Sequence, residues 1–197
     1  MPERSTPRTA RHAATRARIL EEAWALGRES GLAGISLRDL AARVGMRAPS
    51  LYSYFPSKSA IYDAMFADAN RALLALIEPV AADESLDARA RVHLGARTWM
   101  DFCCADPVRF ALLYQRTVPG FEPSPESYAL ALRIVELLTT GLRESGRTDQ
   151  RDLDLHTAYL SGLAAQQIAN DPGGDRWSRL LDDTVALLLD GVPEGPR

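Results

Sequence analysis

The sequence is poor in the residues that build several classes of protein. Its 197 residues include two cysteines and one lysine. No run approaches the ~18 consecutive apolar residues of a membrane-spanning helix. Cys103 and Cys104 are sequence neighbours, which rarely pair, and two cysteines make no zinc framework. We therefore expect no disulfide scaffold, no metal site and no contact with a membrane.

Signals for export and for catalysis are also missing. The Arg-rich N-terminus is not followed by an apolar segment with a cleavage site, so we expect a cytoplasmic protein. There is no nucleophile elbow, phosphate loop or zinc-binding helix motif, and no carboxylate pair that spacing can certify. The sequence predicts no enzyme and no cofactor. Cys103, Cys104 and His93 could form a metal or oxidant-sensing site, but adjacent helical side chains diverge by ~100°.

The overall negative charge hides a basic first third. The formal net charge is −3, yet residues 1–60 carry ten Lys and Arg against five Asp and Glu, or +5. Residues 61–197 carry thirteen against twenty-one, or −8. This asymmetry indicates a small head that binds a polyanion, joined to an acidic body with another task.

Apolar residues recur at helical spacing along the chain, without strand alternation or an internal repeat. The fold class predicted is all-α with about nine helices: three in the head, one connecting and five in the body. We expect these helices at about 15–30, 37–44, 48–54, 57–79, 85–105, 107–116, 125–144, 150–170 and 175–190.

The two short helices of the head meet at Gly45, where a sharp turn needs a positive φ. Ser36 with Asp39 three residues later is a capping signal for the first of them. Pro49 suits the first turn of the second, and Ser57 can cap the connecting helix. A third helix precedes the pair, which is the plan of a helix-turn-helix.

The segment from Gly45 to Lys58 reads "GMRAPSLYSYFPSK". Through this run, residues 19–65 resemble the DNA-binding domain of the tetracycline-repressor (TetR) family of bacterial transcription regulators. The resemblance implies a helix-turn-helix domain at 14–56, a connecting helix at 57–79 and a ligand-binding and dimerisation domain at 80–197. The preceding residues 1–13 are rich in Pro, Ser and Arg, which predicts a disordered basic arm.

The resemblance also implies roles for individual residues of the head. Arg38 would reach a guanine edge or a phosphate, and the start of the second helix would face the major groove. Tyr52, Tyr54 and Lys58 would contact phosphates. The expected DNA-binding residues are Thr15, Ser36, Arg38, Arg47, Ala48, Pro49, Ser50, Tyr52, Tyr54 and Lys58.

For the body, the resemblance implies a homodimer with a cavity for a small-molecule effector. The expected ligand-binding residues are Trp99, Phe102, Cys103, Phe110, Tyr114, Phe121, Tyr128, His156 and Gln166. The expected dimer interface comprises Leu160, Leu163, Ala164, Ile168, Leu181, Val185 and Leu188. For each aromatic residue, a place in the ordinary core is an open alternative.

The function expected is that of a transcription regulator, in most such cases a repressor, which a small, largely apolar effector releases from a palindromic operator. Two alternatives stay open: a dimeric DNA-binding regulator without an effector, and, remotely, an all-α enzyme. The effector, the operator and the sign of regulation are not readable from the sequence.

Overall fold

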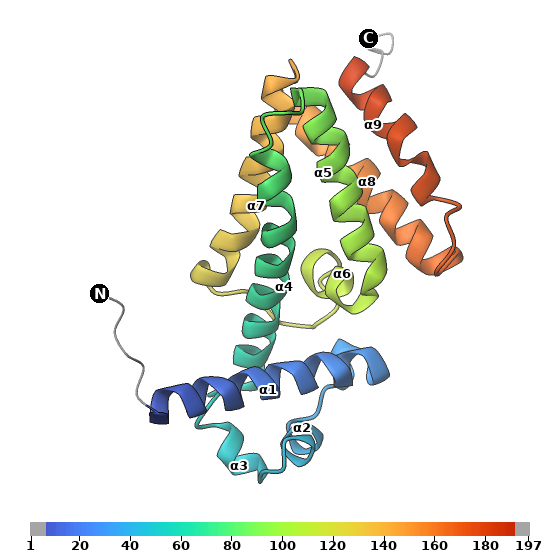
Figure 1. The fold of residues 1–197 in the computed structure, drawn as a ribbon. Coiled ribbons are helices and arrows are strands. Elements are labelled where there is room, and N and C mark those ends of the chain that lie inside the picture. Colours follow the sequence, from blue (N-terminus) through green and yellow to red (C-terminus); the bar gives the residue numbers. More distant parts are fainter. Residues whose placement is uncertain (1–6, 192–197) are drawn as a thin grey trace.

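The chain folds into a small helical head beneath a larger helical body (Figure 1). The computed structural model describes residues 7–191. Within that range there are nine α-helices and no strand, in agreement with the predicted all-α class. They are α1 (Pro7–Ser30), α2 (Leu37–Arg43), α3 (Ala48–Leu51), α4 (Lys58–Ala81), α5 (Ala88–Ala105), α6 (Pro107–Tyr114), α7 (Pro125–Glu144), α8 (Gln150–Asn170) and α9 (Leu181–Asp190).

Short polar side chains set the beginnings of several helices. The hydroxyl of Ser36 accepts a hydrogen bond from the Asp39 N–H, and Ser57 accepts one from Ala60, as the sequence predicted. Ser124 caps α7 in the same way. Each cap satisfies an amide that would otherwise lack a partner in the first helical turn.

Several helix boundaries differ from the sequence-based expectations; α5 begins at Ala88 and α6 ends at Tyr114, a few residues inside the expected bounds. Helix α1 begins at Pro7, so residues 7–13 of the expected disordered arm are helical, and residues 1–6 lie outside the described residues. Helix α3 ends at Leu51 instead of 54, and its chain continues as a turn. Helix α4 continues through Pro79 to Ala81, because a proline in the last turn removes only one hydrogen bond.

The segment 175–190 is the largest departure, since only its second half is regular helix. A 3₁₀ turn, Ser178–Leu180, precedes α9. The side-chain oxygen of Gln167 accepts hydrogen bonds from the Trp177 and Ser178 amides at 2.8 and 3.0 Å. This side chain on α8 therefore holds the segment in a turn before the helix begins.

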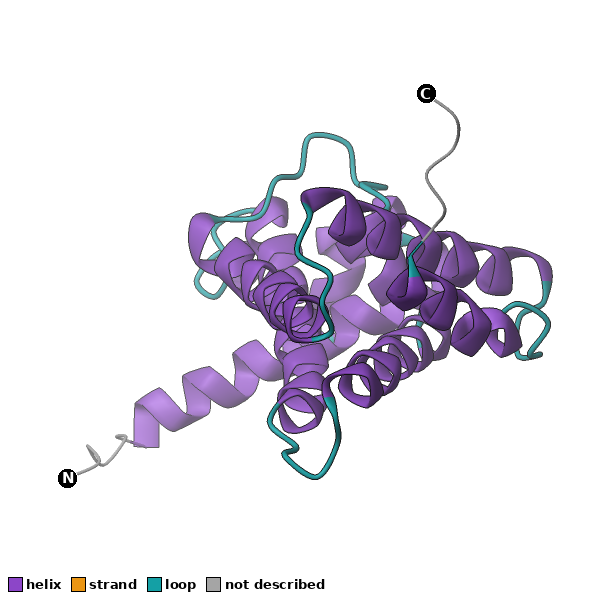
Figure 2. Ribbon diagram, turned by 90° about the horizontal axis from the view of Figure 1, so that it is seen from above, coloured by secondary structure: helices purple, strands orange, loops and turns teal. Residues whose placement is uncertain are grey.

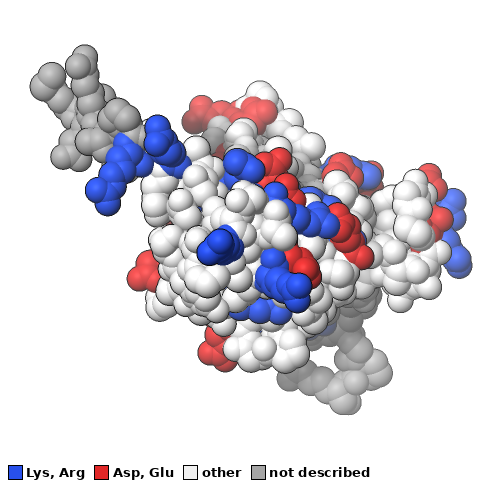
Figure 3. Space-filling model, turned by 90° about the horizontal axis from the view of Figure 1, so that it is seen from below, with Lys and Arg blue, Asp and Glu red and all other residues white. Residues whose placement is uncertain are grey.

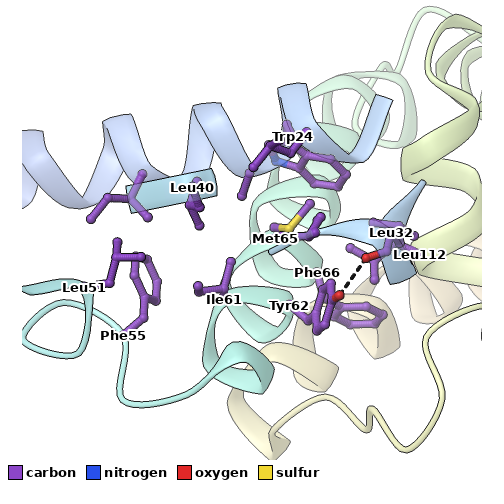
Figure 4. Packing of buried hydrophobic residues seen from close by; sticks show 14 of the residues in the cluster. Trp24, Leu32, Leu40, Leu51, Phe55, Ile61, Tyr62, Met65, Phe66 and Leu112 are labelled. Atoms are coloured by element: carbon purple, nitrogen blue, oxygen red, sulfur yellow. Dashed lines mark hydrogen bonds between the residues drawn. The ribbon is translucent and has the colours of Figure 1, made fainter. Parts of the chain in front are cut away.

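Two hydrophobic clusters form the core. The first joins the helices of the head to the beginning of α4 and to Leu112 of α6 (Figure 4). Within it, the buried hydroxyl of Tyr62 donates a 2.6 Å hydrogen bond to the Leu32 carbonyl. The second cluster fills the body and includes Leu73 and Ile77 of α4. Helix α4 thus contributes to both clusters.

Polar contacts connect the head, the connecting helix α4 and the body at three places. The indole N–H of Trp24 donates to Asp68 on α4. Arg28 at the end of α1 forms a 2.6 Å ion pair with Asp106, whose carboxylate also caps α6. The carboxylate of Asp63 accepts hydrogen bonds from Ser124 and Ser127 at the start of α7.

Viewed from above, the N-terminal half of α1 projects beyond the outline of the body helices (Figure 2). None of the described helices is long and apolar enough to span a bilayer.

Gly45 allows a test of the turn between α2 and α3. Its φ is +73°, and a Cβ atom built there would meet nothing within 4 Å. Backbone conformation alone should therefore set the effect of a substitution. We expect Gly45→Ala to lower the free energy of unfolding by about 1–2 kcal/mol, and Gly45→Asn to cost less, because Asn tolerates this conformation better. Urea unfolding of the three proteins measures both changes. Equal stability of all three would contradict the strained-turn explanation.

Candidate DNA-binding surface and ligand cavity

The angle between α2 and α3 is set by a small, fully packed core. Leu40, Ala41, Val44 and Leu51 are all buried, as the sequence predicted. The amides of Gly45 and Met46 donate back to carbonyls of α2 and close the turn. The beginning of α3 is thereby held at a fixed position on the lower surface of the head.

The expected DNA-binding residues all lie on the head, but their side chains differ in how far they are exposed to solvent. Arg38, Arg47, Pro49, Ser50 and Tyr52 are exposed. Neither Arg38 nor Arg47 has an ion-pair partner in the described part of the chain. Seen from below, the molecule shows separate basic side chains within a surface that is largely uncharged (Figure 3). These two guanidinium groups are therefore free for phosphates or base edges.

The other five expected DNA-binding residues are half-buried: Thr15, Ser36, Ala48, Tyr54 and Lys58. The Thr15 hydroxyl donates to the Arg11 carbonyl in its own helix. The Tyr54 ring stacks on His12 at 4.7 Å between centroids. The Lys58 ammonium group lies 3.3 Å from the Ala33 carbonyl. The side chains of Thr15, Tyr54 and Lys58 thus already have partners within the head, so a bound phosphate would be added to an ordered arrangement.

Arg16 and Arg43 are basic residues whose side chains make contacts within the head. Arg16 donates a 2.6 Å hydrogen bond to the Tyr54 carbonyl, and its guanidinium lies 4.1 Å from the centre of the Phe55 ring. Arg43 forms ion pairs with Glu29 and Glu22, and its hydrogen bond lowers the pKa of Glu29. Arg16 thus links α1 to the segment after α3, and the positive charge of Arg43 is balanced by the two glutamates.

A cavity of about 220 Å³ lies in the body and opens to solvent past exposed lining residues such as Val135 and Thr157. Its wall is formed by five helices, α4 to α8, and is mainly aliphatic. Two small residues, Gly95 and Gly141, lie on facing helices α5 and α7. A Cβ at Gly141 would lie 3.2 Å from Val92, whereas one at Gly95 would meet no atom within 4 Å. Gly141 therefore lets α5 and α7 approach each other, and Gly95 leaves space open in the cavity.

Three of the nine expected ligand-binding residues line this cavity: Trp99, Tyr114 and His156. The indole N–H of Trp99 donates a 2.8 Å hydrogen bond to the Tyr114 hydroxyl. The remaining six do not line it. They are Phe102, Cys103, Phe110, Phe121, Tyr128 and Gln166.

These six residues have other environments. Phe102, Cys103 and Phe110 are buried in the body cluster, where burial raises the pKa of the Cys103 thiol. Phe121 packs in the head cluster, against Tyr62. The other two, Tyr128 and Gln166, lie exposed on α7 and α8.

His156 is the most unusual polar group of the cavity wall. Its side chain is 1% exposed, and its Nδ1 atom has no hydrogen-bond partner in the described chain. Burial, with a smaller contribution from nearby His93, lowers the pKa of His156 to about 4. The imidazole is therefore neutral at pH 7.

Most of the residues expected at the dimer interface have contacts inside the chain. Leu160 lines the cavity, while Ala164, Leu181, Val185 and Leu188 are buried. Leu163 and Ile168 are half-buried. A second copy that approached α8 and α9 would instead meet exposed Tyr159 and Leu187. Both the dimer and its expected contact residues stay predictions.

Most of the cavity wall differs from the expected ligand-binding residues, because those were mainly aromatic. The wall is mainly aliphatic: Ile77 and Val80 on α4, Val92 on α5, and Ile134, Leu137 and Leu138 on α7. The only available signal was the spacing of Val92, Gly95, Ala96 and Trp99, which places small residues within one helix face. Among the described residues, no group of three or more His, Cys, Asp or Glu could hold a metal ion.

Comparison with known proteins connects this geometry with transcription regulators. Residues 19–65 match the model of bacterial regulatory proteins of the tetR family. The HTH-type transcriptional regulator Rv1816 of Mycobacterium tuberculosis (strain ATCC 25618 / H37Rv) is 30% identical over 109 residues, which are 54% of this chain and 47% of that protein. The chain thus spans about half the length of the curated relatives that it matches.

Solved structures extend the likeness over almost the whole chain. The TetR family transcriptional regulator PfmR of Thermus thermophilus is 25% identical, with a TM-score of 0.65, covering 90% of this chain and 100% of that one. The protein SCO4313 is 21% identical, with a TM-score of 0.77, covering 94% and 100%. The second likeness concerns the fold alone.

The lowered pKa of His156 predicts a loss of stability in acid. The unfolded chain, with an ordinary histidine pKa near 6.5, binds the proton more readily than the folded chain, with a pKa of about 4. Acidification from pH 6.5 to about 4 therefore favours unfolding, by up to about 3 kcal/mol from this residue.

Urea unfolding of the wild type and of His156→Gln across this pH range measures the contribution. The wild type should lose more stability on acidification than the variant, which has no titrating group at this position. Parallel pH dependence in the two proteins would contradict a neutral, buried His156.

Proposed function

Because this chain belongs to the tetR family of bacterial regulatory proteins, we propose that it is a cytoplasmic, homodimeric, ligand-responsive transcription regulator. The unliganded dimer binds a palindromic operator and represses transcription. A small, largely apolar molecule enters the cavity of the body and lowers the affinity for DNA.

The observation that carries this proposal is the path of α4. Its first turns, with Ile61 and Met65, belong to the core of the head. Its last turns, with Ile77 and Val80, form part of the cavity wall. One continuous helix therefore connects the two sites, and a ligand that displaces its upper end moves its lower end.

Helix α6 offers a second connection. Tyr114 at its end lines the cavity, while Leu112 packs in the core of the head. Asp106 at its beginning is paired with Arg28 of α1. A ligand that repositions α6 changes both its packing against the core of the head and its ion pair with α1.

The DNA contacts proposed follow from exposure and free charge. Arg38, at the start of α2, and Arg47, before α3, reach bases or phosphates, and Ser50 and Tyr52 add hydroxyl groups. A single head makes few contacts, so specific binding requires two heads one DNA turn apart. Residues 14–56 thus form the DNA-binding domain, 57–79 the connecting helix, and 80–197 the domain that dimerises and binds the ligand.

Release follows from thermodynamic linkage. Operator half-sites have a fixed spacing, so a dimer with its heads at a different spacing makes poorer contacts. A ligand shifts the population only as far as it prefers the released form over the DNA-bound form.

Selection from genomic DNA tests the DNA-binding part directly. The purified protein is mixed with fragments of its own genome at about 150 mM salt, where non-specific binding is weakened, and the retained fragments are sequenced. We expect enrichment of a palindrome. Retention without a shared sequence, before and after stripping of any co-purified ligand, would contradict a specific regulator.

Lys58 tests the phosphate contacts. We expect Lys58→Ala to weaken binding to all DNA sequences and to reduce the salt dependence of the affinity by about one ion per head. Titrations of the selected operator at several salt concentrations measure this change. Arg151→Ala is the control, because Arg151 is an exposed residue of α8 in the body. If both variants behave like the wild type, Lys58 makes no phosphate contact.

Gly95 tests the ligand part without removing any existing side chain. A side chain added there enters the cavity, since a Cβ meets nothing within 4 Å. We expect Gly95→Ala to weaken ligand binding moderately and Gly95→Leu to abolish it. Both variants should bind the operator with the affinity of the unliganded wild type. Undiminished release of Gly95→Leu from the operator by a ligand would place the ligand site elsewhere.

A further inference from the structure

We propose that residues 7–18, the projecting part of α1, form a second DNA-contacting element, whose arginines bind phosphates of the DNA that flanks each operator half-site. We call these residues the basic extension. This inference rests on the proposed DNA-binding function and enlarges the surface that each head presents to DNA.

The charge of the basic extension is not balanced inside the chain. Residues 7–18 include Arg8, Arg11, Arg16 and Arg18 and no Asp or Glu. All four side chains are exposed, and Arg16 is the one that contacts the head. Arg8, Arg11 and Arg18 form no ion pair with a described residue. Exposed guanidinium groups without an acidic neighbour are available to a polyanion.

Helical spacing places the three unpaired arginines on one side of α1. At 100° per residue, positions 8, 11 and 18 fall within about 80° of one another. Seen from below, basic side chains gather where the described chain begins, on the face that also shows the separate basic side chains of the head (Figure 3). The basic extension therefore presents its charge on the same face of the molecule as the proposed DNA contacts.

Contacts with the turn after α3 hold the basic extension in place. The His12 ring stacks on the Tyr54 ring, with 4.7 Å between centroids. Arg16 donates a 2.6 Å hydrogen bond to the Tyr54 carbonyl, and its guanidinium lies 4.1 Å from the centre of the Phe55 ring. Tyr54 follows the end of α3 at Leu51 by three residues. The position of the extension is thus tied to that of the helix proposed to enter the major groove.

The length of the basic extension fits a run of phosphates. From Arg8 to Arg18 the helix rises by about 15 Å, at 1.5 Å per residue. One DNA strand carries a phosphate about every 3.4 Å along the axis, so this length matches about four phosphates. Arginines spaced along a helix outside the groove contact the backbone, which carries no sequence information. The extension should therefore add affinity without adding base preference.

Two duplexes that share the selected palindrome measure the flanking contacts. The short duplex ends at the palindrome, and the long duplex continues on each side for about eight base pairs of unrelated sequence, twice the length that the extension covers. We expect the wild type to bind the long duplex about tenfold more tightly, or more, at about 150 mM salt. Hydroxyl-radical footprinting should show protection of about four flanking base pairs on each side.

A triple variant assigns this preference to the basic extension. Arg8→Gln, Arg11→Gln and Arg18→Gln together remove three charges per head and keep residues of high helix propensity. The triple variant should bind both duplexes with the affinity of the wild type for the short one. Its salt dependence on the long duplex should fall by up to about three ions per head.

The matched control changes the net charge equally in the body. Arg143, Arg151 and Arg179 are exposed there and form no ion pair with a described residue. Replacement of all three by Gln should leave the preference for the long duplex at the wild-type value. A control that loses the preference as the triple variant does would make it an effect of net charge and overturn the inference.

The outcomes separate this inference from the proposed function. Equal affinity of the wild type for both duplexes, or a preference that survives in the triple variant, would overturn the inference and leave specific operator binding standing. An equal loss on both duplexes would also overturn it, because the contacts would then lie within the palindrome. The wild-type footprint does not depend on the folding of a variant, and protection that stops at the palindrome would likewise overturn the inference.

The absence of any specific operator would contradict the proposed function instead. Binding to random duplex DNA then tests the basic extension by itself. The triple variant should bind such DNA more weakly than the body control, with a smaller salt dependence. Equal binding by the two variants would show that the extension makes no phosphate contact.

Discussion

The fold depends on one constraint: α4 must pack in two hydrophobic clusters at once. Its lower turns complete the core of the head around Ile61 and Met65, and its upper turns complete the core of the body around Leu73 and Ile77. The helix cannot move at one end alone without bending or losing apolar contacts. Packed cores resist such continuous deformation, so a disturbance at one end is passed along the helix.

The polar contacts between head and body reinforce this constraint in different directions. Asp68 holds Trp24 of α1, Asp63 holds the start of α7, and Asp106 joins α6 to Arg28. Each of the three aspartates connects elements that are distant in the sequence. The head is thus attached to α4 and α6, and α4 in turn to α7, and all three of these helices contribute to the cavity wall.

Helix positions and the head could be predicted from sequence because their causes are local. Ser36, Ser57 and Pro107 mark helix beginnings through their own backbone chemistry, and Gly45 marks the turn through its φ. The cavity could not be predicted in this way, because it is a space left between helices. Gly95 opens it only because α4, α7 and α8 surround α5 at a particular register, which a single sequence does not reveal. Aromatic residues such as Phe102 and Phe110 were poor guides, since burial in a core and exposure to a cavity require the same residue types.

Asp106 has two tasks at one carboxylate, since it caps the first turn of α6 and pairs with Arg28. Because the cap fixes the carboxylate at the start of α6, a separation of α1 from α6 lengthens its contact with the half-exposed Arg28 side chain and weakens the ion pair. Asp106 thus opposes any displacement that would separate α1 from α6, and this places resistance to such a movement at a single carboxylate.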